Sequence, residues 1–297
     1  MQKLKIVLTI GLIFGLVTTT QAAVTLFSAG FETSEGYSTG LLVNGRRTDS
    51  NPGQVGWYGE TYNSEAVSQT KVHQALVSTG QAHSGSQAME MPAEDYFYDL
   101  YHQDFDKKNT GLLTTEFWYY LDFFDTSSAN PRADANNINV MLYDRDVGIL
   151  TEGFWTPYGS RVETEGPNKF GYASQPAWSN FFERTDISIA GAWRGIKVVM
   201  DLDFHTFDIY SKFPGDADWE LNLDDAVFYG SVDNLTEGIG TVSIMQLTAM
   251  GDYPGTYFNH PDHRAYIDDI LITWVPEPAT IGLLLVGGLA LLRRRRA

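Results

Sequence analysis

A single predicted strand carries the residues with the clearest capacity for chemistry. In the stretch LLTTEFWYYLDFF (112–124), successive side chains of a strand point to opposite faces. Phe117, Tyr119, Leu121 and Phe123 share one face, and the other face carries Glu116, Trp118, Tyr120 and Asp122. Aromatic rings stack on the apolar faces of pyranoses, while carboxylates accept hydrogen bonds from sugar hydroxyls. The second set is therefore predicted to bind a glycan.

An alternative stays open for this face. Trp118 and Tyr120 can instead be covered by loops and fill a second core, which is the commoner fate of tryptophan in a chain with 13% aromatic residues. Two further aromatic pairs, Trp57-Tyr58 and the Trp155–Tyr158 segment, lie in glycine-rich stretches, where we expect them to pin loops to the body of the protein.

The elements that position these residues are predicted to be strands. Between Ala23 and Val275 there is no long run with a period of 3.6 residues, and short alternating segments are separated by Gly, Asn, Asp and Pro. Besides 112–124, we expect strands in 137–144, 193–213 (two strands with a turn near Asp203 to His205), 241–250 and 264–274. The predicted fold class is all-β, a two-sheet antiparallel β-sandwich of jelly-roll type.

The body of the chain resembles concanavalin A-like jelly rolls, the laminin-G and glucanase class. The resemblance rests on the run VVMDLDFHTFDIY, the later strand AYIDDILIT and the early pair Phe31-Glu32, and it spans roughly residues 24 to 274. It implies that an early acidic residue and an aspartate of the last strand meet at a sheet edge around Ca²⁺. Carried over, Glu32 with Asp268 or Asp269 supplies oxygen ligands for one structural calcium ion.

The alternative for the aspartate pair is that both side chains face solvent or accept hydrogen bonds from loop amides. Because neighbouring strand residues point to opposite faces, we expect at most one of Asp268 and Asp269 to need a buried partner.

The sequence supplies no catalytic residues. Jelly-roll retaining glucanases carry Glu-x-Asp-x-x-Glu on one strand, and nothing here matches it. Glu116 and Asp122 are six residues apart, which is ~20 Å in a strand and beyond the roughly 5–9.5 Å that glycosidases use. His260 and His263 have no third metal ligand beside them, and nucleophile-elbow, phosphate-loop and dinucleotide motifs are absent from the sequence. Whether the chain is an enzyme stays open, and a binding protein is favoured; a polysaccharide lyase or glycoside hydrolase is the alternative.

The N-terminus reads as a secretory signal peptide. Lys3 and Lys5 precede an apolar run from Ile6 to Val17, and the stretch ends with small residues around a predicted cleavage site after Ala22. A retained membrane helix is the alternative, but the run has about 12 residues where a span needs ~20.

The C-terminus, VPEPATIGLLLVGGLALLRRRRA (275–297), has 14 uncharged residues before its arginines. As a helix these cover ~21 Å, less than the ~30 Å hydrocarbon core, and the arginines mark the cytoplasmic side. The order of motif, apolar helix and basic cluster resembles the PEP-CTERM sorting signal of Gram-negative bacteria, whereas a plain tail anchor is the alternative. The residues that carry the resemblance are Pro276, Glu277, Pro278, Arg293, Arg294, Arg295 and Arg296.

The PEP-CTERM resemblance implies an exosortase-like membrane protease or transpeptidase as partner, transient anchoring in the inner membrane, and delivery to the outer surface or extracellular matrix. Its predicted layout is a signal peptide (1–22), a β-sandwich domain (23–275) and a sorting signal (276–297). Without Lys3, Lys5 and the terminal arginines the chain keeps 14 basic and 37 acidic side chains, a net charge of −23, which disfavours nucleic acid. There is no cysteine, so no disulfide supports the fold. The predicted function is to bind or organise extracellular polysaccharide; a purely structural matrix protein is a further alternative.

Overall fold

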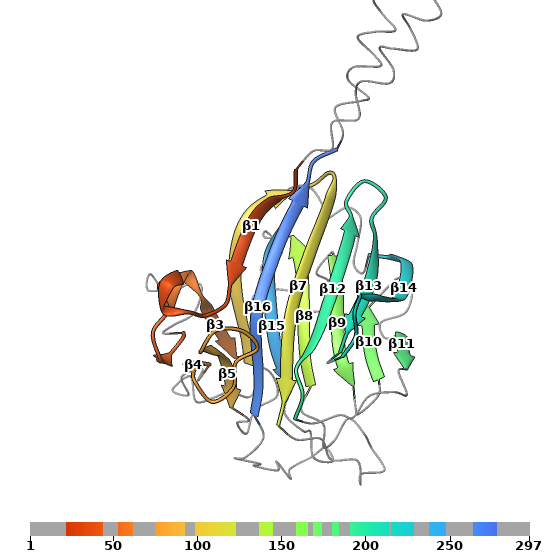
Figure 1. Cartoon of the computed structure of the whole chain (residues 1–297). Helices are drawn as coiled ribbons and strands as arrows, with labels where there is room; N and C mark the ends of the chain where they lie inside the picture. Colours follow the sequence, from red (N-terminus) through yellow and green to blue (C-terminus); the bar gives the residue numbers. More distant parts are fainter. Residues whose placement is uncertain are drawn as a thin grey trace, which may run out of the picture.

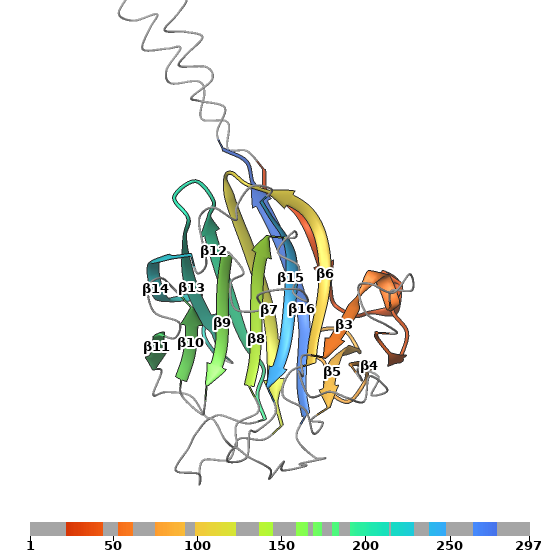
Figure 2. The same ribbon diagram turned by 180° about the vertical axis from the view of Figure 1, so that it is seen from behind.

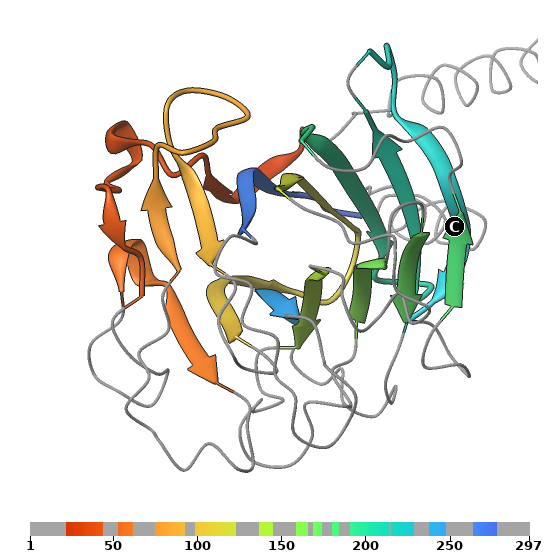
Figure 3. The same ribbon diagram turned by 90° about the horizontal axis from the view of Figure 1, so that it is seen from below.

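The structure is a computed structural model of the chain, seen from three sides in Figures 1–3. It describes residues 22–43, 53–61, 75–92, 99–122, 137–144, 159–165, 169–173, 180–183, 191–213, 215–228, 238–247 and 264–277. Within these ranges every strand pairing is antiparallel. The strands form two sheets that lie face to face, and the predicted two-sheet antiparallel sandwich is confirmed (Figure 3).

The larger sheet, nine strands in the described residues, faces the viewer in Figure 1 and has the order β14-β13-β12-β7-β16-β5-β4-β2, with β1 also pairing to β16. We call it the front sheet. Its strands are β1 (Val24–Ala29), β2 (Gly40–Leu41), β4 (Leu76–Ser78), β5 (Ala88–Pro92), β7 (Leu112–Leu121), β12 (Arg194–Asp201), β13 (Thr206–Lys212), β14 (Glu220–Val227) and β16 (Arg264–Val275).

The second sheet, the back sheet, faces the viewer in Figure 2 and has the order β11-β10-β9-β8-β15-β6-β3 in the described residues. Its strands are β3 (Tyr58–Thr61), β6 (Asp99–Lys108), β8 (Asn137–Asp144), β9 (Gly159–Glu165), β10 (Lys169–Ala173), β11 (Asn180–Glu183) and β15 (Ile239–Leu247). Two short 3-10 helices complete the described elements, η1 (Thr33–Glu35) and η2 (Gln54–Gly56).

Strand β7 follows the alternation expected from its sequence. Phe117, Tyr119 and Leu121 are buried, whereas Glu116 and Trp118 are only partly covered. The buried set belongs to one hydrophobic cluster that includes residues of the back sheet such as Val242 and Ile244. Since each buried large apolar side chain contributes about 1.5–3 kcal/mol, this face holds the sheets together and leaves the opposite face of β7 for other contacts.

The other strand predictions are confirmed with small shifts at the ends. The segment 193–213 forms β12 and β13, with the turn at 202–205, and 264–274 lies within β16. Trp57 is completely buried and its indole N–H donates to the Tyr37 hydroxyl at 3.1 Å, so it pins its loop as expected. Phe123 and the Trp155–Tyr158 segment lie outside the described residues.

The two ends of the body lie at the same end of the sandwich. Val24 of β1 is the register partner of Trp274 of β16, and both strands reach the top of Figure 1. In the described part of the chain, no helix has the length and apolar character needed to cross a membrane. The predicted signal and sorting helices fall outside that part, and the predicted domain boundaries stay predictions.

Candidate functional site: an aromatic face and a carboxylate-held loop

The outer face of the front sheet carries the glycan-binding residues predicted from sequence. Glu116, Trp118 and Tyr120 lie on the same face of β7, and Asp122 directly follows the strand, where its backbone N–H donates to the Arg264 carbonyl at 3.0 Å. All four side chains are partly exposed. Burial raises the pKa of the Asp122 carboxyl, while the nearby Arg264 charge lowers it. The structure therefore places Glu116, Trp118 and Tyr120 on one face, with Asp122 directly beyond the end of the strand; their role in glycan binding stays a prediction.

Trp118 lies between two other rings. The imidazole of His83 stacks on it with ring centres 3.8 Å apart and an angle of 11°, and Trp219 lies at 6.0 Å with an angle of 48°. Gly195 of β12 is the register partner of Trp118, and a Cβ there would lie 2.8 Å from Trp219 and 3.0 Å from Trp118. The indoles thus occupy the space above a residue without a side chain.

Tyr120 extends this contact network along β7. Its ring lies 5.7 Å from that of Trp193, just before β12, and 5.9 Å from that of Tyr266 on β16. Trp193 in turn meets His83 edge-on at 5.7 Å. Such tilted and edge-to-face pairs contribute about 0.5–1.5 kcal/mol each beyond area burial.

A lysine completes the cluster on its far side. The ammonium of Lys197 on β12 lies 4.4 Å from the ring centre of Tyr210 and 5.0 Å from that of Trp219, a cation–π arrangement. We call the five partly exposed rings the aromatic face; they are Trp118, Tyr120, Trp193, Tyr210 and Trp219.

Several polar groups of this face have no partner among the described residues. Neither the Glu116 carboxylate nor the Tyr120 hydroxyl makes a hydrogen bond or ion pair there, and the indole N–H of Trp118 has none either. The face thus combines apolar ring surface with one free acceptor and free donors, which is the combination that sugar recognition uses.

Next to the aromatic face, carboxylates hold the loop before β5 against the interior strand β16. Glu32 accepts hydrogen bonds from the Ser86 N–H at 2.6 Å, the Ser86 hydroxyl at 3.0 Å and the Gln87 N–H at 2.8 Å. The pKa of Glu32 is lowered, most of all by the hydrogen bond from the Ser86 backbone N–H, because these three donors favour the charged carboxylate. We call residues 83–87 the clamped loop.

Asp268 holds the other end of the clamped loop. It is completely buried, and its Oδ2 accepts the backbone N–H groups of His83 at 2.8 Å and Ser84 at 3.1 Å, while its Oδ1 accepts the Asp269 N–H at 2.8 Å. Burial, with the negative charge of Asp269 second, raises the pKa of Asp268 to about 7. Its three backbone donors offset only part of the desolvation.

Asp269 contacts the same loop, which corrects an expectation from sequence. Asp269 Oδ2 lies 2.7 Å from His83 Nδ1, and its Oδ1 accepts from the Ser84 hydroxyl at 2.7 Å. We expected the two aspartates to point to opposite faces, but the register between β16 and β7 shifts between Asp268 and Leu271, and Asp269 has a φ of 49°. A β-bulge therefore turns both carboxylates toward one loop.

The predicted calcium ligands Glu32, Asp268 and Asp269 all contact the clamped loop. Every carboxylate oxygen of Glu32, Asp268 and Asp269 already accepts a hydrogen bond from a loop or neighbouring group. These bonds match the alternative in which the aspartates accept from loop groups. The calcium assignment itself stays a prediction.

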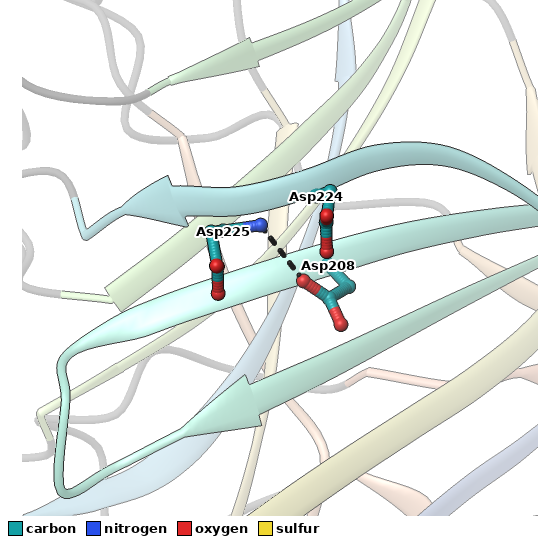
Figure 4. A group of neighbouring side chains, drawn as sticks. All are labelled: Asp208, Asp224 and Asp225. Carbon is teal, nitrogen blue, oxygen red and sulfur yellow. Dashed lines mark hydrogen bonds between the residues drawn. The ribbon is translucent and has the colours of Figure 1, made fainter.

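A different acidic set has mutual distances suited to a cation. In the described part of the chain, oxygens of Asp208, Asp224 and Asp225 lie within 4.8 Å of one another (Figure 4). Asp208 comes from β13 and the other two from β14, where a bulge gives Asp225 a φ of 52° and its N–H donates to Asp208 Oδ1 at 2.9 Å. The triad was not predicted from sequence because Asp208 is 16 and 17 residues away from Asp224 and Asp225 and meets them only through strand pairing.

The processing residues are placed only in part. Ala22 lies two residues before β1, and Pro276 and Glu277 directly follow β16, so these predicted sites are at the same end of the sandwich. A hydrogen bond with Asp203 raises the pKa of Glu277. Pro278 and Arg293 to Arg296 lie outside the described residues.

No protein-family model matches the sequence, and a search of curated proteins gives no match either. Among solved structures, an endo-1,3-β-glucanase from Streptomyces sioyaensis is similar with a TM-score of 0.52 at 11% identity, covering 86% of this chain and 97% of that one. The fold is a jelly roll. Basic winged bean lectin, determined with Tn-antigen, gives a TM-score of 0.44 at 10% identity over 85% of this chain and 98% of the lectin.

A sialidase is also similar, with a TM-score of 0.40 at 13% identity over 73% of this chain, which spans only 16% of the sialidase. At such identities the similarity extends to the fold alone.

Four aromatic residues of the site were not predicted from sequence: His83, Trp193, Tyr210 and Trp219. Trp193 precedes an alternating strand and Trp219 precedes another, so each had a signal as a strand-start aromatic. Nothing local in the sequence marks His83, whose position depends on the β16 aspartates more than 180 residues away.

Proposed function

We propose that the chain is a carbohydrate-binding protein that uses the aromatic face of its front sheet. The supporting observation is a continuous set of five partly exposed rings across β7, β12, β13 and the strand starts, with Glu116 unpaired among them. Sugar rings stack on such surfaces, and Glu116 accepts from their hydroxyls. The similarity of fold to a β-1,3-glucanase is consistent with a carbohydrate ligand.

The proposal includes the export and sorting predicted from the two ends of the chain. In it the signal peptide is removed after Ala22, the tail anchors the chain transiently in the inner membrane, and an exosortase-like enzyme recognises Pro276-Glu277-Pro278. The body then reaches the outer surface or extracellular matrix of a Gram-negative bacterium and binds or organises polysaccharide there. Mass spectrometry of the mature protein from its host tests this; an intact arginine tail would contradict it.

The binding test measures the affinity of the purified protein for its host's exopolysaccharide by titration calorimetry. We expect saturable binding, with an affinity that falls roughly tenfold or more in Trp219→Ala because the indole supplies stacking area for the sugar. Trp219 is chosen because it lies directly before β14 rather than in the middle of a strand. Phe204→Ala is the matched control, since Phe204 is 79% exposed in the β12–β13 turn and outside the aromatic face. Equal losses in both variants, or no saturable binding by the wild type, would contradict the proposal.

A second candidate function, cleavage of the glycan, is favoured by one observation. The His83 imidazole lies 2.7 Å from Asp269 Oδ2 and is stacked on Trp118, so an oriented base stands at the edge of the aromatic face. Assaying the binding mixtures for new reducing ends and unsaturated uronates distinguishes the two. New ends that disappear in His83→Ala would make the chain an enzyme. Binding without new ends leaves the lectin-like function, and co-purification with the matrix without saturable binding leaves a structural protein.

A further inference from the structure

The aromatic face already binds an alkylammonium group, that of its own Lys197. The Nζ atom lies over two rings, at 4.4 Å from the centre of Tyr210 and 5.0 Å from that of Trp219. Ring quadrupoles attract cations, and clustered aromatic rings recognise ammonium ligands in this way. Trp118 and Trp193 are also partly exposed and have no lysine above them among the described residues; His83 stacks on one side of Trp118 and meets Trp193 edge-on.

The cations described on this outer face are all engaged within the protein. Lys197 lies over rings, the Lys212 ammonium donates to the Ala217 carbonyl at 3.1 Å, and Arg264 pairs with Glu90 at 3.2 Å. Glu116 is the register partner of Lys197, yet neither that lysine nor any other described cation pairs with its carboxylate. Among the described residues, the Glu116 carboxylate therefore has no ion-pair partner and lies next to the partly exposed rings of the aromatic face.

We propose that this face selects glycans with unacetylated amino sugars, whose ammonium group lies over an aromatic ring beside the Glu116 carboxylate. This rests on the proposed function and specifies its substrate class. The same charge arrangement acts against uronate and sulfated polymers, because their anionic groups meet an unpaired carboxylate on a strongly acidic protein.

The decisive experiment compares two hexasaccharides with the same β-1,4 backbone, one of glucosamine and one of N-acetylglucosamine. Calorimetric titrations of the purified protein run in mildly acidic, low-salt buffer, which keeps the amines charged. We expect the glucosamine hexamer to bind about tenfold more tightly than the N-acetylglucosamine hexamer. This ratio corresponds to one cation–π contact together with a partly screened ion pair. The difference in affinity should shrink as the salt concentration rises, because salt screens the ion pair. An oligouronate hexamer serves as the anionic comparison and is expected to bind most weakly.

Two variants assign the preference to Glu116. Glu116→Gln keeps the size of the side chain and removes its charge, so the preference for glucosamine should fall to threefold or less. Asp106→Asn removes one charge from an exposed residue of β6 in the back sheet and should keep the full preference. Retention of the preference in Glu116→Gln would overturn the assignment of the ammonium site.

The wild-type outcomes separate this inference from the proposed function. Equal binding of the two aminosugar hexamers, or tighter binding of the uronate, overturns the amino-sugar preference while glycan binding by the face stands. Failure of all three to bind overturns the amino-sugar preference, and failure of the host exopolysaccharide to bind overturns the proposed function as well. Tighter binding of glucosamine that is lost in Glu116→Gln and kept in Asp106→Asn supports the inference.

Discussion

Two acidic clusters on the front sheet have the same chemical groups and different surroundings. Glu32, directly before η1, and Asp268 and Asp269 of β16 face the clamped loop, and their oxygens accept hydrogen bonds from its amides, hydroxyls and imidazole. At β13 and β14, the Asp208 triad is mostly exposed, its oxygens lie within 4.8 Å of one another, and one backbone N–H points into it.

The difference teaches that donors and burial decide what a carboxylate does. In the first cluster the negative charges organise a loop and so place His83 on Trp118. In the second cluster the carboxylates lie at the surface, and one backbone N–H donates to them. A buried carboxylate is expensive to leave unpaired, whereas an exposed one is inexpensive to change, and the two clusters should therefore respond very differently to pH, substitution and cations.

The largest expected effect is a pH dependence that comes from Asp268. Its pKa is about 7 when folded and 3.8 in its unperturbed state, so between these values the folded chain holds a proton that the unfolded chain releases. The free energy of unfolding should therefore fall as pH rises from about 4 to 7, by up to roughly 4 kcal/mol. Urea unfolding at stepped pH measures it.

Two variants check the source of that slope. Asp268→Asn should abolish it and Asp224→Asn should keep it; identical slopes in wild type and Asp268→Asn would contradict the role of Asp268. The lowered pKa of Glu32 acts with the opposite sign and in a lower window, since its contribution is present above its unperturbed pKa of 4.5 and is lost as pH falls.

The next effect is steric and probes the clamped loop itself. Gly85 has a φ of +61°, and an added Cβ would collide with Glu32 Oε1. We expect Gly85→Ala to lower the free energy of unfolding by about 2 kcal/mol, because both the left-handed backbone and the collision oppose it. Gly215→Ala, at a φ of +99° with open space around the added atom, is the matched control for backbone strain alone. If Gly85→Ala lowers the free energy of unfolding no more than Gly215→Ala does, the close contact between Gly85 and Glu32 does not contribute to stability.

A smaller effect concerns calcium, the cofactor predicted from sequence. If the ion binds Glu32 with Asp268 or Asp269, calcium at ten times its dissociation constant should stabilise the fold by about 1.4 kcal/mol, and chelator should reverse this. Scanning calorimetry with Asp268→Asn and Asp224→Ala tells the two clusters apart. A wild-type melting temperature that does not change with calcium or chelator would contradict calcium binding at both acidic clusters.

The smallest effect is expected at the exposed triad. Asp224→Ala should change the free energy of unfolding by no more than about 0.5 kcal/mol, since it removes an exposed carboxylate from a group of like charges. A decrease of more than about 1 kcal/mol in the free energy of unfolding, measured with urea in the presence of chelator, would show that the triad stabilises the fold as the clamped loop does.

The alternation of β7 was readable from sequence because one buried face imposes a period of two. The same rule gave a wrong expectation at Asp268 and Asp269, because a β-bulge interrupts the alternation there and no local sequence pattern predicts the bulge. The predicted glycan-binding residues Glu116, Trp118 and Tyr120 share one face of β7 as expected, but their ring partners come from the residues just before β12 and β14, from β16 and from the clamped loop.

By itself, the sequence determined the sandwich class, the strands β7, β8, β12, β13, β15 and β16, and the acidic character of the protein. These follow from local periodicity and composition, which need no knowledge of distant contacts. Only the tertiary structure decided that His83 stacks on Trp118, that both β16 aspartates hold one loop, and that Glu116 pairs with no cation among the described residues. Each of these depends on groups far apart in the chain, whose meeting is set by strand order and register rather than by any neighbouring residue.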